Sequence, residues 1–182
     1  MHHSTHPTHT LDLRVHELQQ LFNSLDPTPF LNKDLDRACE LFIESWALAL
    51  AHDSHLHLRI HVGQLAASAD ADAGEVVAGA VHNHYAYKAD LVRGELRQLL
   101  HLGRMSLGVG LVFVVACLLL AETLTSLVPG RSARIAHESL TIIGWVAMWR
   151  PVQIFLYDWW PLSGRIKVFE NLRRARVSVL PA

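Results

Sequence analysis

Two stretches in the first part of the chain alternate strictly between apolar and polar residues. The clearer one is residues 55–62, where Leu, Ile or Val occupies every second position and His or Arg stands between them. Residues 11–15 alternate in the same way. A period of two is typical of a half-buried strand, so both stretches predict strands. Residues 176–180 repeat the pattern near the other end of the chain and predict a third strand.

Between these predicted strands, apolar residues recur at the spacing of a helix. Residues 22–36 are rich in Asn, Ser, Asp and Pro, which favour turns, and Asn32 or Asp34 is expected to cap a helix that runs to about Ala51. A linker at 66–74 precedes a further helix that is expected to continue into the apolar region beyond it. The order strand–helix–strand–helix predicts parallel strands with a right-handed crossover.

Residues 105–121 contain no charged side chain, and the apolar character continues to residue 128 with Glu122 as the one interruption. At about 1.5 Å per residue this stretch is long enough for the roughly 30 Å hydrocarbon core of a bilayer. A core helix of a soluble protein is the alternative, but a core helix of this length normally carries a polar stripe. A membrane span at about 105–128 is therefore predicted.

A second apolar stretch at about 139–157 contains Arg150 and Pro151. Proline removes a backbone donor, so a kink is expected near Ala147. Tyr157, Trp159 and Trp160 follow as an interfacial aromatic belt. A second, kinked span is favoured over a helix that enters only as far as Trp149 and then lies along the surface.

These elements predict an α+β protein: a small cytoplasmic strand–helix–strand–helix domain joined to a transmembrane two-helix hairpin. The expected boundaries are a disordered His-rich tail at 1–10, the cytoplasmic domain at 11–103, the hairpin at 104–160 and a basic cytoplasmic tail at 161–182.

The formal net charge of −1 conceals an uneven distribution along the chain. Residues 1–100 carry 7 Lys and Arg against 13 Asp and Glu, whereas residues 101–182 carry 9 against 4. The connector between the spans offers only Arg131 and Arg134. Nine basic side chains flank the hairpin, namely Lys88, Arg93, Arg97 and Arg104 before it and Arg165, Lys167, Arg173, Arg174 and Arg176 after it. This bias, with no signal peptide at the start, predicts a multi-pass protein of the bacterial inner membrane with both termini cytoplasmic. The near-zero net charge argues against a nucleic-acid partner.

Four histidines form the one cluster with metal-site spacing, namely His52, His55, His57 and His61. Alternate strand residues share a face, so these imidazoles would converge on Zn²⁺ or another transition metal. The same pattern describes the solvent face of an amphipathic strand, Arg59 adds positive charge, and no carboxylate lies on the stripe. A solvated face is favoured. His82 and His84 diverge by about 200° around a helix and are expected on the surface.

Glu122 and Arg150 are ionisable side chains at membrane depth and therefore candidate functional residues. They would form an ion pair inside the hairpin or contact another subunit; a proton path is the least favoured role. Ser106 and Gly110 give the first span a small-residue face, and Gly144 gives the second span another, each suited to close helix packing.

Residues 22–36, 82–100 and 144–161 resemble segments of small bacterial inner-membrane proteins with a soluble N-terminal region and a C-terminal helical hairpin. The resemblance implies this architecture and carries no activity, cofactor or site residue.

The chain has no Walker loop, GxSxG, GxGxxG or CxxC motif. We therefore expect a non-enzymatic accessory or scaffolding subunit of a larger membrane complex, for example a respiratory or photosynthetic one, with no cofactor. Its partners would be integral membrane subunits, the bilayer and a second copy. The expected contact surface is Trp145, Trp149, Arg150, Phe155, Tyr157, Trp159 and Trp160. The alternative is a metal-binding or metal-sensing membrane protein; a small enzyme or membrane-remodelling factor has no discriminating residue.

Overall fold

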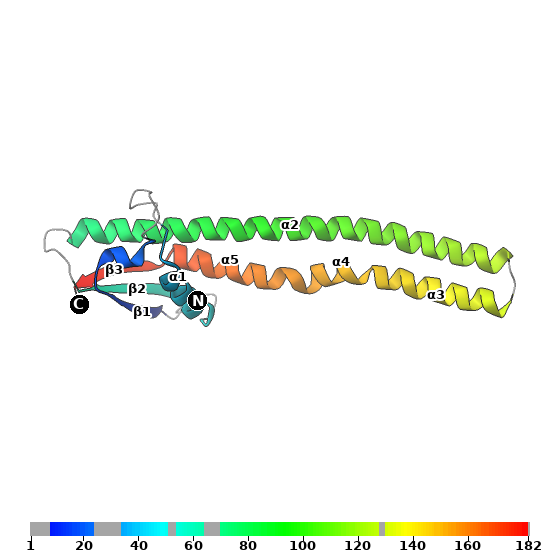
Figure 1. The fold of residues 1–182 in the computed structure, drawn as a ribbon, viewed down its shortest axis with the longest axis horizontal. Helices are drawn as coiled ribbons and strands as arrows, with labels where there is room; N and C mark the ends of the chain where they lie inside the picture. Colours follow the sequence, from blue (N-terminus) through cyan, green and yellow to red (C-terminus); the bar gives the residue numbers. More distant parts are fainter. Residues whose placement is uncertain (1–7, 24–33, 51–53, 64–69, 128–129, 182) are drawn as a thin grey trace, which may run out of the picture. The chain divides into compact units, whose positions relative to one another are not determined.

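The computed structural model describes residues 8–23, 34–50, 54–63, 70–127 and 130–181 (Figure 1). The chain forms two compact units. The first, called the sheet unit, comprises Met1–Arg93 and Gly164–Ala182. The second, called the helical unit, is Gly94–Ser163 and lies between these two stretches in the sequence.

Three parallel strands form the sheet in the order β1-β2-β3. They are β1 (Thr8–Val15), β2 (His55–Val62) and β3 (Arg176–Pro181), and Figure 1 shows them side by side. All three predicted strands and their parallel pairing are confirmed. Because β1 begins at Thr8, the expectation of disorder is wrong for residues 8–10, and residues 1–7 lie outside the described part of the chain.

The helix between β1 and β2 is α1 (Arg37–Leu48), which follows a short 3₁₀ turn η1 (Leu18–Leu21). Its cap is Asp36, whose carboxylate accepts hydrogen bonds from the backbone N–H groups of Ala38 (2.9 Å) and Cys39 (3.4 Å). Asp34, one predicted cap, therefore lies two residues too early, and Asn32 falls outside the described residues. Backbone pairing between Phe22 and Leu35 fixes where α1 starts.

The core of the sheet unit follows the alternation of β2, whose side chains Leu56, Leu58, Ile60 and Val62 are all buried. Helix α2 (Asp70–Leu127) adds Val77, Val81 and Tyr85 at four-residue spacing. Helix α5 (Trp159–Arg173) adds a further cluster, Val168, Phe169 and Leu172. Burying each large apolar side chain contributes about 1.5–3 kcal/mol, so these positions stabilise the unit.

The connection from β2 to β3 contains the whole helical unit. Parallel strands require a crossover, and here the crossover leaves the sheet unit along α2 and returns along α5. Helix α2 is continuous over 58 residues, which confirms that the helix predicted after the linker runs on into the first apolar segment.

The returning arm begins with α3 (Arg131–Ala147), eight residues before the expected start of the second apolar segment. It ends at Ala147, as Pro151 predicts, because proline supplies no N–H to the preceding turn. Helix α4 (Trp149–Gln153) and a π-helical turn η3 (Ile154–Asp158) lead into α5. The π-helical turn was not predicted. Such a turn adds one residue to an α-helix, and this leaves the spacing of the apolar residues almost unchanged.

Two helical runs are long and apolar enough to cross a membrane, Gly74–Leu127 and Arg131–Arg173. Only 17% of the residues in the apolar window of each run are buried, whereas the core helix of a soluble protein is mostly buried. The exposed residues of these two runs include Val112, Leu119, Ile142 and Val146.

Candidate functional site

Glycines bring the two arms of the helical unit together. A Cβ on Gly110 would lie 3.1 Å from Met148 Sδ and 3.5 Å from the carbonyl oxygen of Ala147. A Cβ on Gly144 would lie 3.6 Å from Cys117 Cβ, and one on Gly103 would lie 2.8 Å from Ile154 Cγ2. The small residues Gly110 and Gly144 therefore meet the opposite arm of the same chain, and Ser106 lines a groove beside Gly110.

This register predicts a disulfide in a Gly144→Cys variant. The 3.6 Å separation from Cys117 Cβ lies within the range that disulfides require. In a Cys39→Ser background treated with a membrane-permeant oxidant, trypsin cleavage at Arg131 and Arg134 should leave two fragments linked until reduction. Val146→Cys is the control, because it places the cysteine on the same arm at a side chain that is 67% exposed. Equal linkage in both variants would contradict the register.

Large aromatic side chains of the returning arm are exposed. The exposed fraction is 75% for Trp145, 71% for Trp149, 64% for Tyr157 and 62% for Trp160. A shallow groove lies along Trp145 and Trp149, and a second one lies between Trp149 and Tyr157. Trp159 is partly covered and its indole N–H donates to the carbonyl oxygen of Phe155 at 2.9 Å. Trp145, Trp149 and Tyr157 thus form one continuous exposed surface, which we call the aromatic face.

Arg150 and Glu122 do not form the ion pair that was one of the two roles expected for them. The guanidinium of Arg150 lies 3.4 Å from Asp158 Oδ2, eight residues further along the same arm. Since Gly110 faces Ala147 and Met148, Arg150 is level with about residue 108, so Glu122 stands roughly 20 Å away along the axis. Asp158 was not predicted as the partner of Arg150, because the expected pair joined the two helices of the hairpin.

The histidines of β2 contact side chains of the neighbouring strands. His57 Nε2 lies 2.9 Å from Ser178 Oγ on β3, and His61 Nε2 lies 3.3 Å from Asp12 Oδ1 on β1. Burial, followed by the nearby Arg59 and Arg176, lowers the pKa of His57, while Asp12 opposes the shift. The carboxylate that the stripe itself lacks is supplied by Asp12, which the parallel register places beside Arg59.

No group of three His, Cys, Asp or Glu side chains that could hold a metal ion occurs within the described parts of the chain. His55 is exposed, and His52 lies outside the described residues. The three described histidines of the stripe are spread along one strand, and two of them already contact adjacent strands.

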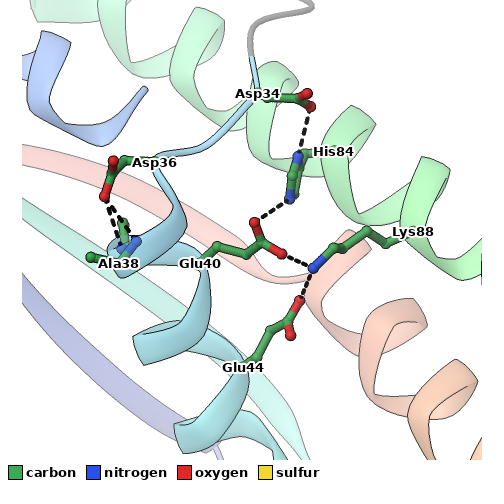
Figure 2. A network of polar contacts seen from close by, with 8 residues as sticks. Asp34, Asp36, Ala38, Glu40, Glu44, His84 and Lys88 are labelled. Carbon is green, nitrogen blue, oxygen red and sulfur yellow. Dashed lines mark hydrogen bonds and ion pairs between the residues drawn. The ribbon is translucent and has the colours of Figure 1, made fainter. Parts of the chain in front are cut away.

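A network of charged side chains connects α1 to α2 (Figure 2). Lys88 on α2 reaches the carboxylates of both Glu40 and Glu44 on α1. One turn earlier on α2, His84 Nδ1 lies 3.1 Å from Asp34 Oδ1 and its Nε2 lies 3.9 Å from Glu40 Oε2. Figure 2 shows the two α2 side chains pointing toward the three carboxylates. Glu40 and Glu44 are four residues apart on α1, and His84 and Lys88 are four residues apart on α2. Each pair therefore lies on one face of its helix.

His84 corrects a sequence expectation, because it is buried and not on the surface. His82 is half-buried and its Nε2 lies 2.8 Å from the carbonyl oxygen of Ala175, in the turn between α5 and β3. The two histidines do point to different sides of the helix, but each side is covered by another part of the sheet unit, Ala175 beside His82 and Asp34 beside His84. No signal in the sequence pointed to these neighbours, which lie 50 and 93 residues away.

Burial sets the electrostatics of the network. It raises the pKa of Glu44 and, together with Arg165 and Arg37, lowers the pKa of Lys88. The ammonium of Lys88 also lies 5.5 Å from the centre of the Phe169 ring. The cation therefore neutralises two carboxylates that are both mostly covered, and its main effect is to hold α1 against α2.

Tyr85 lies beneath this network with its side chain wholly buried and its hydroxyl without a hydrogen-bond partner among the described residues. Its ring is edge-on to His84 at 5.3 Å and 6.1 Å from the ring of Phe169. Burial is the main cause that raises the pKa of Tyr85, and nearby Glu44 adds to it. Burial likewise raises the pKa of Cys39 to about 11, so its thiol is protonated at neutral pH.

Comparisons with protein-family models, with curated proteins and with solved structures found no match. The resemblance to small bacterial inner-membrane proteins therefore remains a prediction from the sequence.

Proposed function

We propose that the protein is a non-enzymatic accessory or scaffolding subunit that is anchored in the bacterial inner membrane by the helical unit and stabilises a larger membrane complex. The sheet unit would lie in the cytoplasm with both termini. The complex would be of the respiratory or photosynthetic type, with integral membrane subunits as the partners.

The observation that carries this proposal is the position of the aromatic face. Tryptophans that anchor a helix to lipid headgroups stand at its interfacial ends, as Trp159 and Trp160 would. Trp149 and Trp145 precede Trp160 by 11 and 15 residues, which corresponds to roughly 16 and 22 Å of helix. Both would stand within a hydrocarbon core of about 30 Å, where lipid alone does not require tryptophan.

Exposed tryptophan, tyrosine and arginine are the residue types enriched at binding hot spots between proteins. The aromatic face supplies the tryptophans and the tyrosine. Arg150 follows Trp149 directly in the sequence and adds an arginine whose side chain is 58% exposed. The outgoing arm differs: its exposed residues between 105 and 127 are mostly aliphatic, with Phe113 as the aromatic exception. This contrast supports a protein partner on the returning arm and lipid on the outgoing arm.

The topology supports a hairpin with both ends on one side. Each arm of the helical unit continues by chain into the sheet unit, through Arg93 on α2 and Gly164 on α5. Arg93 and Glu170 form an ion pair between α2 and α5 within the sheet unit. Basic residues flank these ends, which favours the cytoplasm for that side.

Photo-crosslinking in native membranes tests the proposal. A photoreactive phenylalanine analogue at Trp149 should give one discrete protein adduct, whereas the same analogue at Val112 on the outgoing arm should react mainly with lipid. Val112 is the matched control because its exposed fraction, 72%, is close to the 71% of Trp149. Mass spectrometry of the adduct would then show whether the partner belongs to a respiratory or photosynthetic complex.

Three results would contradict the proposal: only lipid adducts at Trp149, equal protein adducts at both positions, or migration of the untreated protein in a mild-detergent native gel only as a 20 kDa monomer. The metal-binding alternative is not proposed, because no observation on the described residues favours it.

A further inference from the structure

The starts of the three strands border a cavity of about 470 Å³ in the sheet unit. Thr8 begins β1, His55 begins β2 and Arg176 begins β3. Because the strands are parallel, their starts meet at one edge of the sheet. Arg174, in the turn after α5, lies on the same cavity. Residues that are distant in sequence therefore converge there because of the crossover.

The lining of this cavity is cationic. It includes two arginines and two histidines, Arg174, Arg176, His55 and His57, and the described residues that line it include no Asp or Glu. Both arginines are exposed, and neither forms an ion pair with a carboxylate within the described parts of the chain. The sheet unit is otherwise rich in carboxylates, so a lining without one is a local departure from its composition.

The two arginines supply the fixed charge of the cavity. The pKa of His57 is lowered by burial and by Arg59 and Arg176, while Asp12 opposes the shift. His57 keeps a 2.9 Å contact with Ser178 Oγ. Arg174 and Arg176 each bring a guanidinium cation to the lining. An anion in the cavity would therefore meet two guanidinium groups and several further hydrogen-bonding groups.

We infer that this cavity binds a phosphate group, carried by a small phosphate ester or by a lipid headgroup. Guanidinium groups match the oxygen geometry of phosphate and bind it through paired, charge-assisted hydrogen bonds. Thr8, Ser54 and Asn171 add hydroxyl and amide groups to the lining. The volume is within the range of small-molecule sites and exceeds that of a phosphate alone, so part of the attached ester also enters.

Calorimetry on the full chain tests the inference. With the protein in nanodiscs of phosphatidylcholine, glycerol 3-phosphate is the soluble probe. In a second arm, native mass spectrometry measures retention of phosphatidylglycerol from mixed nanodiscs. Arg174→Gln and Arg176→Gln should each weaken binding about tenfold, since each removes a charge-assisted hydrogen bond. Arg173→Gln is the matched control, because Arg173 is an exposed neighbour outside the lining and should leave the affinity unchanged.

Binding of glycerol 3-phosphate alone assigns the site to soluble phosphate esters, and retention of phosphatidylglycerol alone assigns it to a headgroup; either supports the site. Failure of both probes with the unmodified protein, or equal weakening by Arg173→Gln, overturns it. Amide exchange of β2 shows whether each variant keeps its fold, and if Arg176→Gln disturbs β3, Arg174→Gln decides. These results are independent of the crosslinking at Trp149, which probes the helical unit.

Discussion

Lys88→Met is expected to destabilise the sheet unit by about 3 kcal/mol, because it leaves the carboxylates of Glu40 and Glu44 mostly covered and without their cation. Methionine keeps the length and apolar stem of the side chain, so the loss reports the charge and not the packing. Amide exchange of β2 in the full chain measures the opening free energy of the unit. Lys167→Met, at an exposed position of α5, is the control and should change this free energy by less than about 0.5 kcal/mol.

Two further measurements separate the charge effect from other causes. Adding Glu40→Gln and Glu44→Gln to Lys88→Met should recover most of the loss, because neutral amides replace the uncompensated charges. The pKa of Glu44 is already raised by burial, and loss of Lys88 raises it further. Between the raised pKa of Glu44 and its ordinary value, the native state of Lys88→Met binds a proton that the unfolded chain does not. The loss of unfolding free energy in this variant should therefore become smaller as the pH falls toward about 4.5. A deficit that is independent of pH would show that the carboxylates are not its source.

Gly110→Leu is expected to separate the two arms of the helical unit. Even a Cβ at this position lies 3.1 Å from Met148 Sδ and 3.5 Å from the carbonyl oxygen of Ala147, so a whole leucine side chain forces the arms apart. Overpacking of this kind costs about 1–3 kcal/mol. The readout is the yield of the disulfide that Cys117 forms in the Gly144→Cys variant. Positions 110 and 117 lie on the same helix only seven residues, or about two turns, apart. Separation of the arms at position 110 should therefore lower this yield at least fivefold.

Gly108→Leu supplies the matched control for this experiment. No atom lies within 4 Å of its Cβ position, and its gain in helix propensity of about 1 kcal/mol is the same as at position 110. The disulfide yield should therefore be unchanged. Equal losses in both variants would mean that Gly110 does not make a close contact between the arms.

The strands were predictable because each is specified by its own side chains. In β2 the period of two alone separates Leu58 and Ile60, which are buried, from Arg59 and His61, which are partly exposed. The break after Ala147 was equally predictable, because the missing N–H of Pro151 acts only on the preceding turn. Helix starts were less certain: Asp34 and Asp36 are both good caps, and only the backbone contact between Phe22 and Leu35 selects Asp36.

The candidate sites were predictable only in part. The aromatic face follows from residues close together in sequence, so Trp145, Trp149 and Tyr157 were identified early. The network around Lys88 was not, since Glu40 and Glu44 precede it by 48 and 44 residues. Asp12 was not predicted beside His61 for the same reason. The two residues are 49 positions apart in the sequence and are brought together only by the pairing of β1 with β2.

By itself, the sequence determined the elements of this protein: which residues form strands, which helical runs are apolar enough to enter a membrane, and where proline breaks the second run. These properties depend on the chemistry of neighbouring residues, which the chain order contains. Only the tertiary structure decided which side chains meet, including His84 with Asp34 and the arginines Arg174 and Arg176 with the starts of β1 and β2. The crossover through the helical unit places β3 beside β2, and contacts across it depend on that fold and not on spacing along the chain.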